Sequence, residues 1–247
     1  MRTARLGRAV GQGPTAVCGA VLLLPGGEEV SARRPSAVWA AASVRAFGRA
    51  VGRSGRGEGL VTHVVHYRYR GWNGGEAHPA ADATWAADEV VRRYGDVPVC
   101  LVGVGMGGRA ALRAAGHEAV NSVVAVAPWL PEEDAAATPE PVRQLAGRRV
   151  LIVHGTNDER ADPELSFRLA ARAKKANRDV CRFEVHSDGH GLHQHRDEVL
   201  ALTADFVRGA LFGHSLARPL EDALAAPPPI GLRMPLAAGF GRSLRGS

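Results

Sequence analysis

The stretch Gly103-Val104-Gly105-Met106-Gly107-Gly108 decides how this chain folds. It directly follows the apolar run 97–102, so it predicts a buried strand, a tight turn and the start of a helix. Two interpretations fit its letters. They satisfy G-x-G-x-x-G, the phosphate-binding turn of dinucleotide-binding domains. They also match G-x-S-x-G, the strained turn that presents a nucleophilic serine, with Gly105 in the place of the serine.

The composition indicates one folded domain, with or without a tail. The chain has 247 residues, of which 45% are hydrophobic, an ordinary fraction for a globular protein. No apolar run reaches the roughly 18 residues that span a bilayer. The basic start of the chain lacks the apolar core of a signal peptide. The sequence therefore predicts a cytoplasmic protein that does not bind a membrane.

The net charge of +6 raises the question of nucleic-acid binding. The arginines are scattered along predicted helices and both termini, and they form no dense basic block with interleaved aromatic residues. We therefore expect a small-molecule substrate or ligand and no nucleic acid. The sequence leaves the oligomeric state open.

Cysteine and histidine spacing does not predict a metal site. Cys18, Cys100 and Cys181 each lie in or beside an apolar run, without the close pairs that bind zinc, and are predicted to be buried reduced thiols. His193 and His195 lie close together in the chain, but no carboxylate or cysteine ligand has a fixed spacing to them. We expect neither a metal nor a cofactor.

Short apolar runs alternate with longer helical patterns, which predicts a doubly wound, mainly parallel sheet of about six strands. The expected strands are 17–24, 61–67, 97–102, 122–127, 150–153 and 180–185. The expected helices are 36–51, 82–94, 108–115, 163–176 and 194–212. We divide the chain into a basic N-terminal segment (1–16), an α/β domain (17–213) with a possible small cap (128–145), and a Pro/Gly/Arg-rich tail (214–247) expected to be disordered.

The position of the glycine-rich turn argues against the dinucleotide interpretation. Such a turn normally follows the first strand, and an acidic residue about 20 positions later binds the ribose. Here two strands precede the turn, and Ala125 stands 20 positions after Gly105. The strand that contains Ala125 ends without an acidic residue.

Four further segments occur in the order that a serine hydrolase requires. They are LLLPGG (22–27), VVAVAPWLP (123–131), VLIVHGTNDERADPELS (150–166) and EVHSDGHGLH (184–193). With the glycine-rich turn, they give the chain a resemblance to the α/β-hydrolase superfamily, of the small dienelactone-hydrolase-like or thioesterase-like kind, over about 17–212. The resemblance implies an α/β-hydrolase fold.

The resemblance also assigns candidate site residues. Asp158 of the HGTND segment would orient His190, the late histidine, as a general base or acid. The backbone N–H groups of Met106 and Gly27, with Gly26 beside them, would bind an oxyanion. Gly105 departs from the family pattern, because glycine has no side chain that can attack a carbonyl. Glycine also relieves the strained backbone that the turn imposes on a serine.

The remaining candidates are assigned by their place in the chain. Trp72 and Trp129 follow strands at their carboxyl ends, where they would line a substrate pocket or pack under loops. Asp188 competes with Asp158 as the acid, but it stands only two positions before His190. His154 is expected to be structural.

Three hypotheses for function remain. The first is a hydrolase-fold enzyme that acts on a small carbonyl-containing substrate through His190 and Asp158, with hydrolysis, elimination or cyclisation as the reaction. The second is a catalytically inactive homologue that binds a ligand or a partner. The third is a dinucleotide-binding protein.

Overall fold

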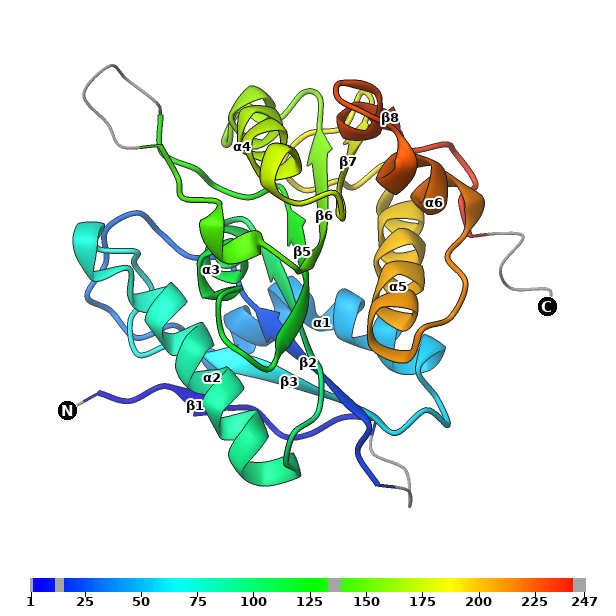
Figure 1. The fold of residues 1–247 in the computed structure, drawn as a ribbon. Helices are drawn as coiled ribbons and strands as arrows, with labels where there is room; N and C mark the ends of the chain where they lie inside the picture. The colour runs from blue at the N-terminus through cyan, green and yellow to red at the C-terminus, as the bar shows by residue number, and fades with distance from the viewer. Residues whose placement is uncertain (1, 12–15, 133–138, 242–247) are drawn as a thin grey trace.

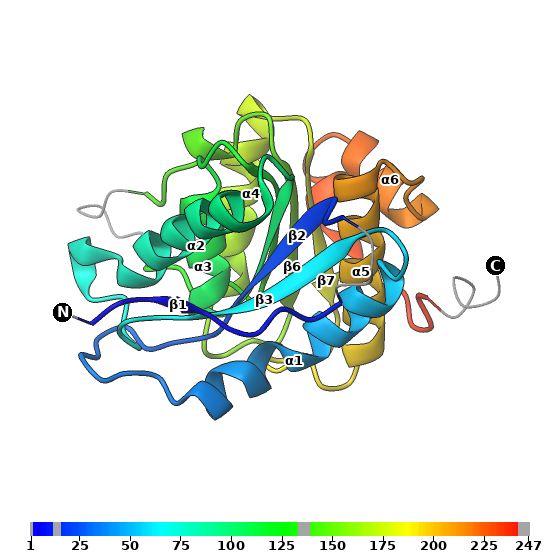
Figure 2. The same ribbon diagram turned by 90° about the horizontal axis from the view of Figure 1, so that it is seen from below.

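The structure is a computed structural model that describes residues 2–11, 16–132 and 139–241. An eight-stranded sheet of order β1-β3-β2-β4-β5-β6-β7-β8 forms its centre, with helices on both faces (Figures 1 and 2). The strands are β1 (Arg5–Leu6), β2 (Gly19–Leu24), β3 (Leu60–His66), β4 (Val99–Val104), β5 (Val120–Val126), β6 (Arg149–Gly155), β7 (Val180–Val185) and β8 (Met234–Pro235). The α-helices are α1 (Ala37–Ser54), α2 (His78–Tyr94), α3 (Met106–Ala114), α4 (Pro163–Ala176), α5 (Arg196–Phe212) and α6 (Arg218–Ala225). Short 3-10 turns cover Gly74–Glu76, Arg143–Leu145 and Ile230–Leu232.

The predicted fold class is confirmed. The six predicted strands are β2 to β7, and they pair in parallel throughout. The predicted bounds of β7 and α4 match the structure. Asp162 caps α4: its carboxylate accepts the N–H of Glu164 at 2.8 Å, and Pro163 follows it in the first turn.

The core lies on both faces of the sheet. On β2, Leu22 and Leu24 point to one face while Val21 and Leu23 point to the other, and all four are buried. Helices α2, α3 and α4 cover the first face, and α1, α5 and α6 cover the second. Burial on both faces explains why the parallel strands are continuous apolar runs.

The basic N-terminal segment contributes an edge strand that was not predicted. β1 pairs antiparallel with β3, with Arg5 opposite His66. Val10 forms a second antiparallel bridge, to Thr62. A two-residue strand is too short to show a periodic pattern in the sequence. β1 can be recognised only from its pairing with β3.

The prediction of a disordered tail over 214–247 is wrong for residues 214–241. This segment forms α6 and then β8, which pairs in parallel with β7, with Phe183 opposite Met234. Leu220, Leu232 and Leu236 of the segment are buried. These apolar residues are sparse along the chain, but they cover the β7 edge together. Residues 242–247 lie outside the described residues.

The possible cap over 128–145 falls partly, at 133–138, outside the described residues. Near the C-terminal end of this segment, Glu140 is buried and forms ion pairs with Arg109 and Arg113 of α3. These ion pairs hold that end of the segment against α3. Within 2–11, 16–132 and 139–241, no helix is long and apolar enough to cross a membrane.

Candidate active site

The glycine-rich turn Gly103–Gly108, called the elbow from here on, joins β4 to α3 at the centre of the sheet. Gly105 has φ +56° and ψ −119°, a conformation that strains any residue with a side chain. Its N–H donates to the carbonyl oxygen of Val126 at 2.9 Å. Its own carbonyl accepts the N–H groups of Gly108 at 2.9 Å and Trp129 at 3.1 Å. The turn is therefore fixed by backbone hydrogen bonds alone.

The glycines on either side of Gly105 are required by packing. A Cβ on Gly107 would stand 2.0 Å from the carbonyl oxygen of Leu24, and a Cβ on Gly103 would stand 2.0 Å from that of Gly107. A Cβ on Gly105 meets only His190, with Nε2 at 3.6 Å, an ordinary van der Waals distance. Position 105 thus has room for a side chain, whereas positions 103 and 107 have none.

His190 and Asp158 form the hydrogen-bonded pair that the sequence predicted. His190 lies in the loop after β7, and its Nδ1–H donates to Asp158 Oδ2 at 2.8 Å. The other ring nitrogen, Nε2, faces the Cβ position of Gly105. The imidazole side chain is 28% exposed, whereas the carboxylate of Asp158 is fully buried. The structure therefore brings His190, Asp158 and Gly105 together.

Four donors hold the Asp158 carboxylate in place. Oδ1 accepts the N–H groups of Arg160 at 2.9 Å and Ala161 at 3.0 Å, and Oδ2 accepts His154 Nε2–H at 3.2 Å besides His190. Burial opposes the ionisation of Asp158, but the hydrogen bonds from both histidines and both N–H groups outweigh it and hold its pKa well below the usual value. Asp158 is therefore a carboxylate at neutral pH.

His154 acts behind this pair, as the sequence predicted for a structural residue. It is fully buried, with Nδ1 at 2.9 Å from Ser166 Oγ. Its Nε2 lies between two acceptors, Asp158 Oδ2 and the carbonyl oxygen of Ala161, so this nitrogen carries the proton. Burial lowers the pKa of His154, and the nearby Arg182 lowers it further. His154 is neutral at physiological pH.

Asp188 shapes the histidine loop and does not bind His190. Its two carboxylate oxygens accept the N–H groups of Gly189, His193, Gln194 and His195 at 3.0–3.1 Å. The side chain is buried, so these bonds replace its lost hydration. Asp188 therefore fixes the loop that carries His190 and leads into α5.

Gly27 and Met106 lie next to each other at the elbow. A Cβ on Gly27 would stand 3.2 Å from Met106 Cγ and 2.5 Å from the carbonyl oxygen of Arg70, so only glycine fits. Met106 is the first residue of α3, where N–H groups have no partner within the helix. In the part of the chain that the structure describes, neither N–H donates to a backbone carbonyl.

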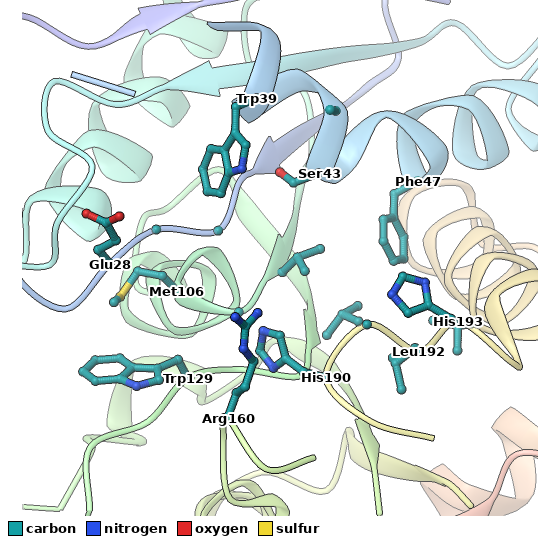
Figure 3. Close-up of a pocket in the computed structure, with 18 of the residues that line it drawn as sticks. Glu28, Trp39, Ser43, Phe47, Met106, Trp129, Arg160, His190, Leu192 and His193 are labelled. Atoms are coloured by element: carbon teal, nitrogen blue, oxygen red, sulfur yellow. The ribbon is translucent and has the colours of Figure 1, made fainter. Parts of the chain in front are cut away.

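A pocket of about 690 Å³ opens in front of Gly105 and His190 (Figure 3). Gly26, Gly27 and Met106 line it, as does Trp129. The pocket has a further group of lining residues that sequence patterns did not predict, from α1 and from three separate loops or helix ends: Trp39, Ser43, Phe47, Arg70, Arg160 and Arg196. On α1, Trp39, Ser43 and Phe47 recur every four residues, which places them on one face. That spacing was the only available signal, and it does not separate a pocket wall from an ordinary core face.

The expectation that Trp72 lines the pocket is wrong. Its side chain is only 3% exposed, and the Arg109 guanidinium covers its ring at 3.9 Å. Arg109 also lies 5.2 Å from the Trp129 ring. Trp72 therefore packs against Arg109 and is not among the residues that line the pocket.

The prediction of buried thiols holds for two of the three cysteines. Cys100 and Cys181 are buried, and burial raises the pKa of each thiol to about 12. Cys18 is exposed, because it lies just before β2 rather than inside it. No group of three or more His, Cys, Asp or Glu side chains in the described ranges is arranged to hold a metal ion.

Comparison with protein-family models matches residues 122–212 to the prolyl oligopeptidase family. The match runs from β5 to α5, less than half of the chain. It contains Asp158 and His190, whereas Gly105 lies before it. Comparison with curated protein sequences finds no match.

Several solved structures resemble the whole domain. An esterase of Pyrococcus furiosus, Pf2001, superposes with a TM-score of 0.63 at 14% identity, over 79% of this chain and 82% of its own. Est1E of Butyrivibrio proteoclasticus, solved with ferulic acid bound, gives 0.59 at 14% identity over 84% and 94% of the two chains. A lidless α/β serine hydrolase of Xanthomonas campestris gives 0.58 at 15% identity over 84% and 89%. The chain therefore has the α/β-hydrolase fold.

Proposed function

We propose that this protein is a hydrolase-fold enzyme that cleaves a small carbonyl substrate without a serine nucleophile. The observation that carries the proposal is the intact His190–Asp158 pair, whose free Nε2 faces Gly105 inside an open pocket. An ionised Asp158 fixes the tautomer of His190, so that Nε2 is the basic nitrogen. The esterase-like structural neighbours and the family match over 122–212 support a hydrolytic reaction.

In this proposal water takes the role of the serine hydroxyl. The attacking water is placed beside Gly105, where a Cβ would stand 3.6 Å from His190 Nε2. His190 takes one proton from this water while the water oxygen attacks the carbonyl carbon. The N–H groups of Gly27 and Met106 stabilise the negative carbonyl oxygen. When the bond to the leaving group breaks, His190 returns the proton to that group. The same base also serves elimination or cyclisation by removing a substrate proton.

The test is hydrolysis of a panel of activated esters and thioesters by the purified protein and its His190→Ala variant. Because general-base catalysis contributes about 10²–10⁴-fold, His190→Ala should lower kcat/KM by that factor. His195→Ala is the matched control, because His195 lies in the same loop and its side chain does not line the pocket. Equal rates for the wild type and His190→Ala would rule out the proposed base.

A second candidate is a homologue that binds a ligand in the same pocket without turnover. The observation that favours it is Gly105, which removes the nucleophile of the family pattern. It predicts ligand binding by both wild type and His190→Ala, with no product from any substrate. Product formation that depends on His190 excludes it.

A further inference from the structure

We propose that the pocket binds a substrate that carries one carboxylate, and that Arg160 recognises this carboxylate beside His190. The proposal rests on the proposed function only in treating the ligand as a substrate, since binding itself needs no catalysis. Its basis is the Arg160 guanidinium, which lines the same pocket as His190 and has no ion-pair partner among the described residues.

The Asp158 loop fixes the position of Arg160. The backbone N–H of Arg160 donates to Asp158 Oδ1 at 2.9 Å. The carboxylate that binds His190 therefore also holds the backbone of Arg160. Arg160 and His190 line the same pocket, and the view in Figure 3 draws their two side chains close together. A ligand group bound by Arg160 therefore lies close to the carbon that the proposed water would attack.

Arg160 differs from Arg70 and Arg109 in its partners; among the described residues the exposed Arg196, at the start of α5, also has no ion-pair partner. Arg70 is held by Glu28 at 3.2 Å and lies over the Trp39 ring at 4.4 Å. Arg109 is paired with the buried Glu140. Among residues 2–11, 16–132 and 139–241, the Arg160 guanidinium forms no ion pair or hydrogen bond with any side chain. A planar guanidinium with all five donors available suits a carboxylate, which it binds through two parallel hydrogen bonds.

The charge of the pocket lining fits a monoanion. The charged lining residues are Arg70, Arg160, Arg196, Glu28 and Glu29. Among these side chains three arginines stand against two glutamates, an excess of one positive charge. A ligand with a negative charge complements this excess, whereas a cation does not.

One wall of the pocket is mainly apolar, although Ser43 and His193 also line it. Trp39 and Phe47 of α1 line it together with Leu192 and Val199 of the histidine loop and α5 (Figure 3). Trp39 is also 40% exposed, so it presents its ring at the mouth of the pocket. Apolar surface buried against this wall adds about 25 cal/mol per Å². The substrate class is therefore a carboxylate with an apolar or aromatic arm, of a size that about 690 Å³ accommodates.

The experiment compares two ligands that differ only in charge, 4-phenylbutyrate and 4-phenylbutanamide, by isothermal titration calorimetry. The wild type should bind the carboxylate about 10-fold more tightly than the amide, since a charge-assisted hydrogen bond contributes at least that much. Arg160→Gln keeps the backbone N–H that holds Asp158 and should remove this preference while leaving amide affinity unchanged. Arg178→Gln is the control, because Arg178 is exposed at the amino end of β7, away from the pocket.

The titration is repeated in His190→Ala, which separates this proposal from the proposed function. Charge-selective binding without turnover in any variant supports the carboxylate site and contradicts the enzyme proposal. Equal affinity for both ligands, no binding of either ligand at millimolar concentration, or a preference that survives Arg160→Gln overturns the carboxylate site, whatever the esterase assays show.

Discussion

The histidine side and the elbow side of the pocket are built in different ways. On the histidine side, side chains hold the site: Asp158 and Asp188 each accept four hydrogen bonds, and these fix His190 and its loop. On the elbow side, backbone packing holds the site: Gly103 and Gly107 fill spaces that admit no Cβ, and Gly105 contributes no side chain. The elbow thus keeps its shape without a nucleophile, because no contact of the turn depends on a side chain at 105.

The largest expected effect is a loss of stability when the backbone packing on the elbow side is disrupted. A Cβ in Gly107→Ala would stand 2.0 Å and 2.5 Å from the carbonyl oxygens of Leu24 and Pro25, so the backbone of the turn or of the segment after β2 would have to shift. We expect a loss of more than about 4 kcal/mol in the free energy of unfolding. Urea denaturation followed by circular dichroism measures it.

Gly52→Ala is the matched control for this prediction. Gly52 lies in helix α1, and a Cβ there meets no atom within 4 Å. This substitution should stabilise the protein by about 0.5–1 kcal/mol, because alanine loses less backbone entropy in a helix. Equal stability of the two variants would contradict the packing argument for the elbow.

The next effect adds a nucleophile between the two sides. Gly105→Ser places a Cβ 3.6 Å from His190 Nε2 and costs about 1–3 kcal/mol in backbone strain. Because His190 and the Gly27 and Met106 amides are already in place, we expect acylation by p-nitrophenyl acetate. Stopped-flow absorbance should show a burst of about one p-nitrophenol per protein molecule.

The double variant Gly105→Ser/His190→Ala is the control for the burst and should show none. If a folded Gly105→Ser protein is not acylated, the two sides are not aligned for acyl transfer, and the comparison above fails for the site as a whole.

The smallest effect concerns the histidine side and pH. Burial lowers the pKa of His154 in the folded protein, whereas the unfolded chain binds a proton at a pKa of about 6.5. The unfolded state therefore binds more protons below that pH, so stability is full above about pH 6.5 and falls as the pH drops. His63 and His66 have lowered pKa values for the same reason and add to this slope.

His154→Gln should make the stability of the protein less dependent on pH. Chemical denaturation at pH 7.5, 6.5 and 5.5 gives the slope for the wild type and the variant. Identical slopes would contradict this prediction. They would show that His154 binds a proton in the folded state as readily as in the unfolded chain, despite its burial.

The parts of the fold that sequence patterns predicted are those with strong local signals. The six core strands are apolar runs because both their faces are buried, and the bounds of β2 and β4 shift by only two residues. The two outer strands were missed, since each has two residues and exists only through pairing with β3 or β7. The glycines and prolines of the C-terminal segment indicated disorder. The segment is ordered over 214–241 because a few buried leucines cover the sheet edge.

The order of motifs along the chain predicted the fold class and the candidate pair Asp158 and His190. It also showed that Gly105 stands where the family pattern has a serine. The reason is that each motif follows a strand, and parallel strands bring their carboxyl ends to one edge. Only the tertiary structure decided which acid binds His190, that Trp72 is covered by Arg109, and that Arg160 faces the pocket. These outcomes depend on distances between segments far apart in the sequence, which no local pattern encodes.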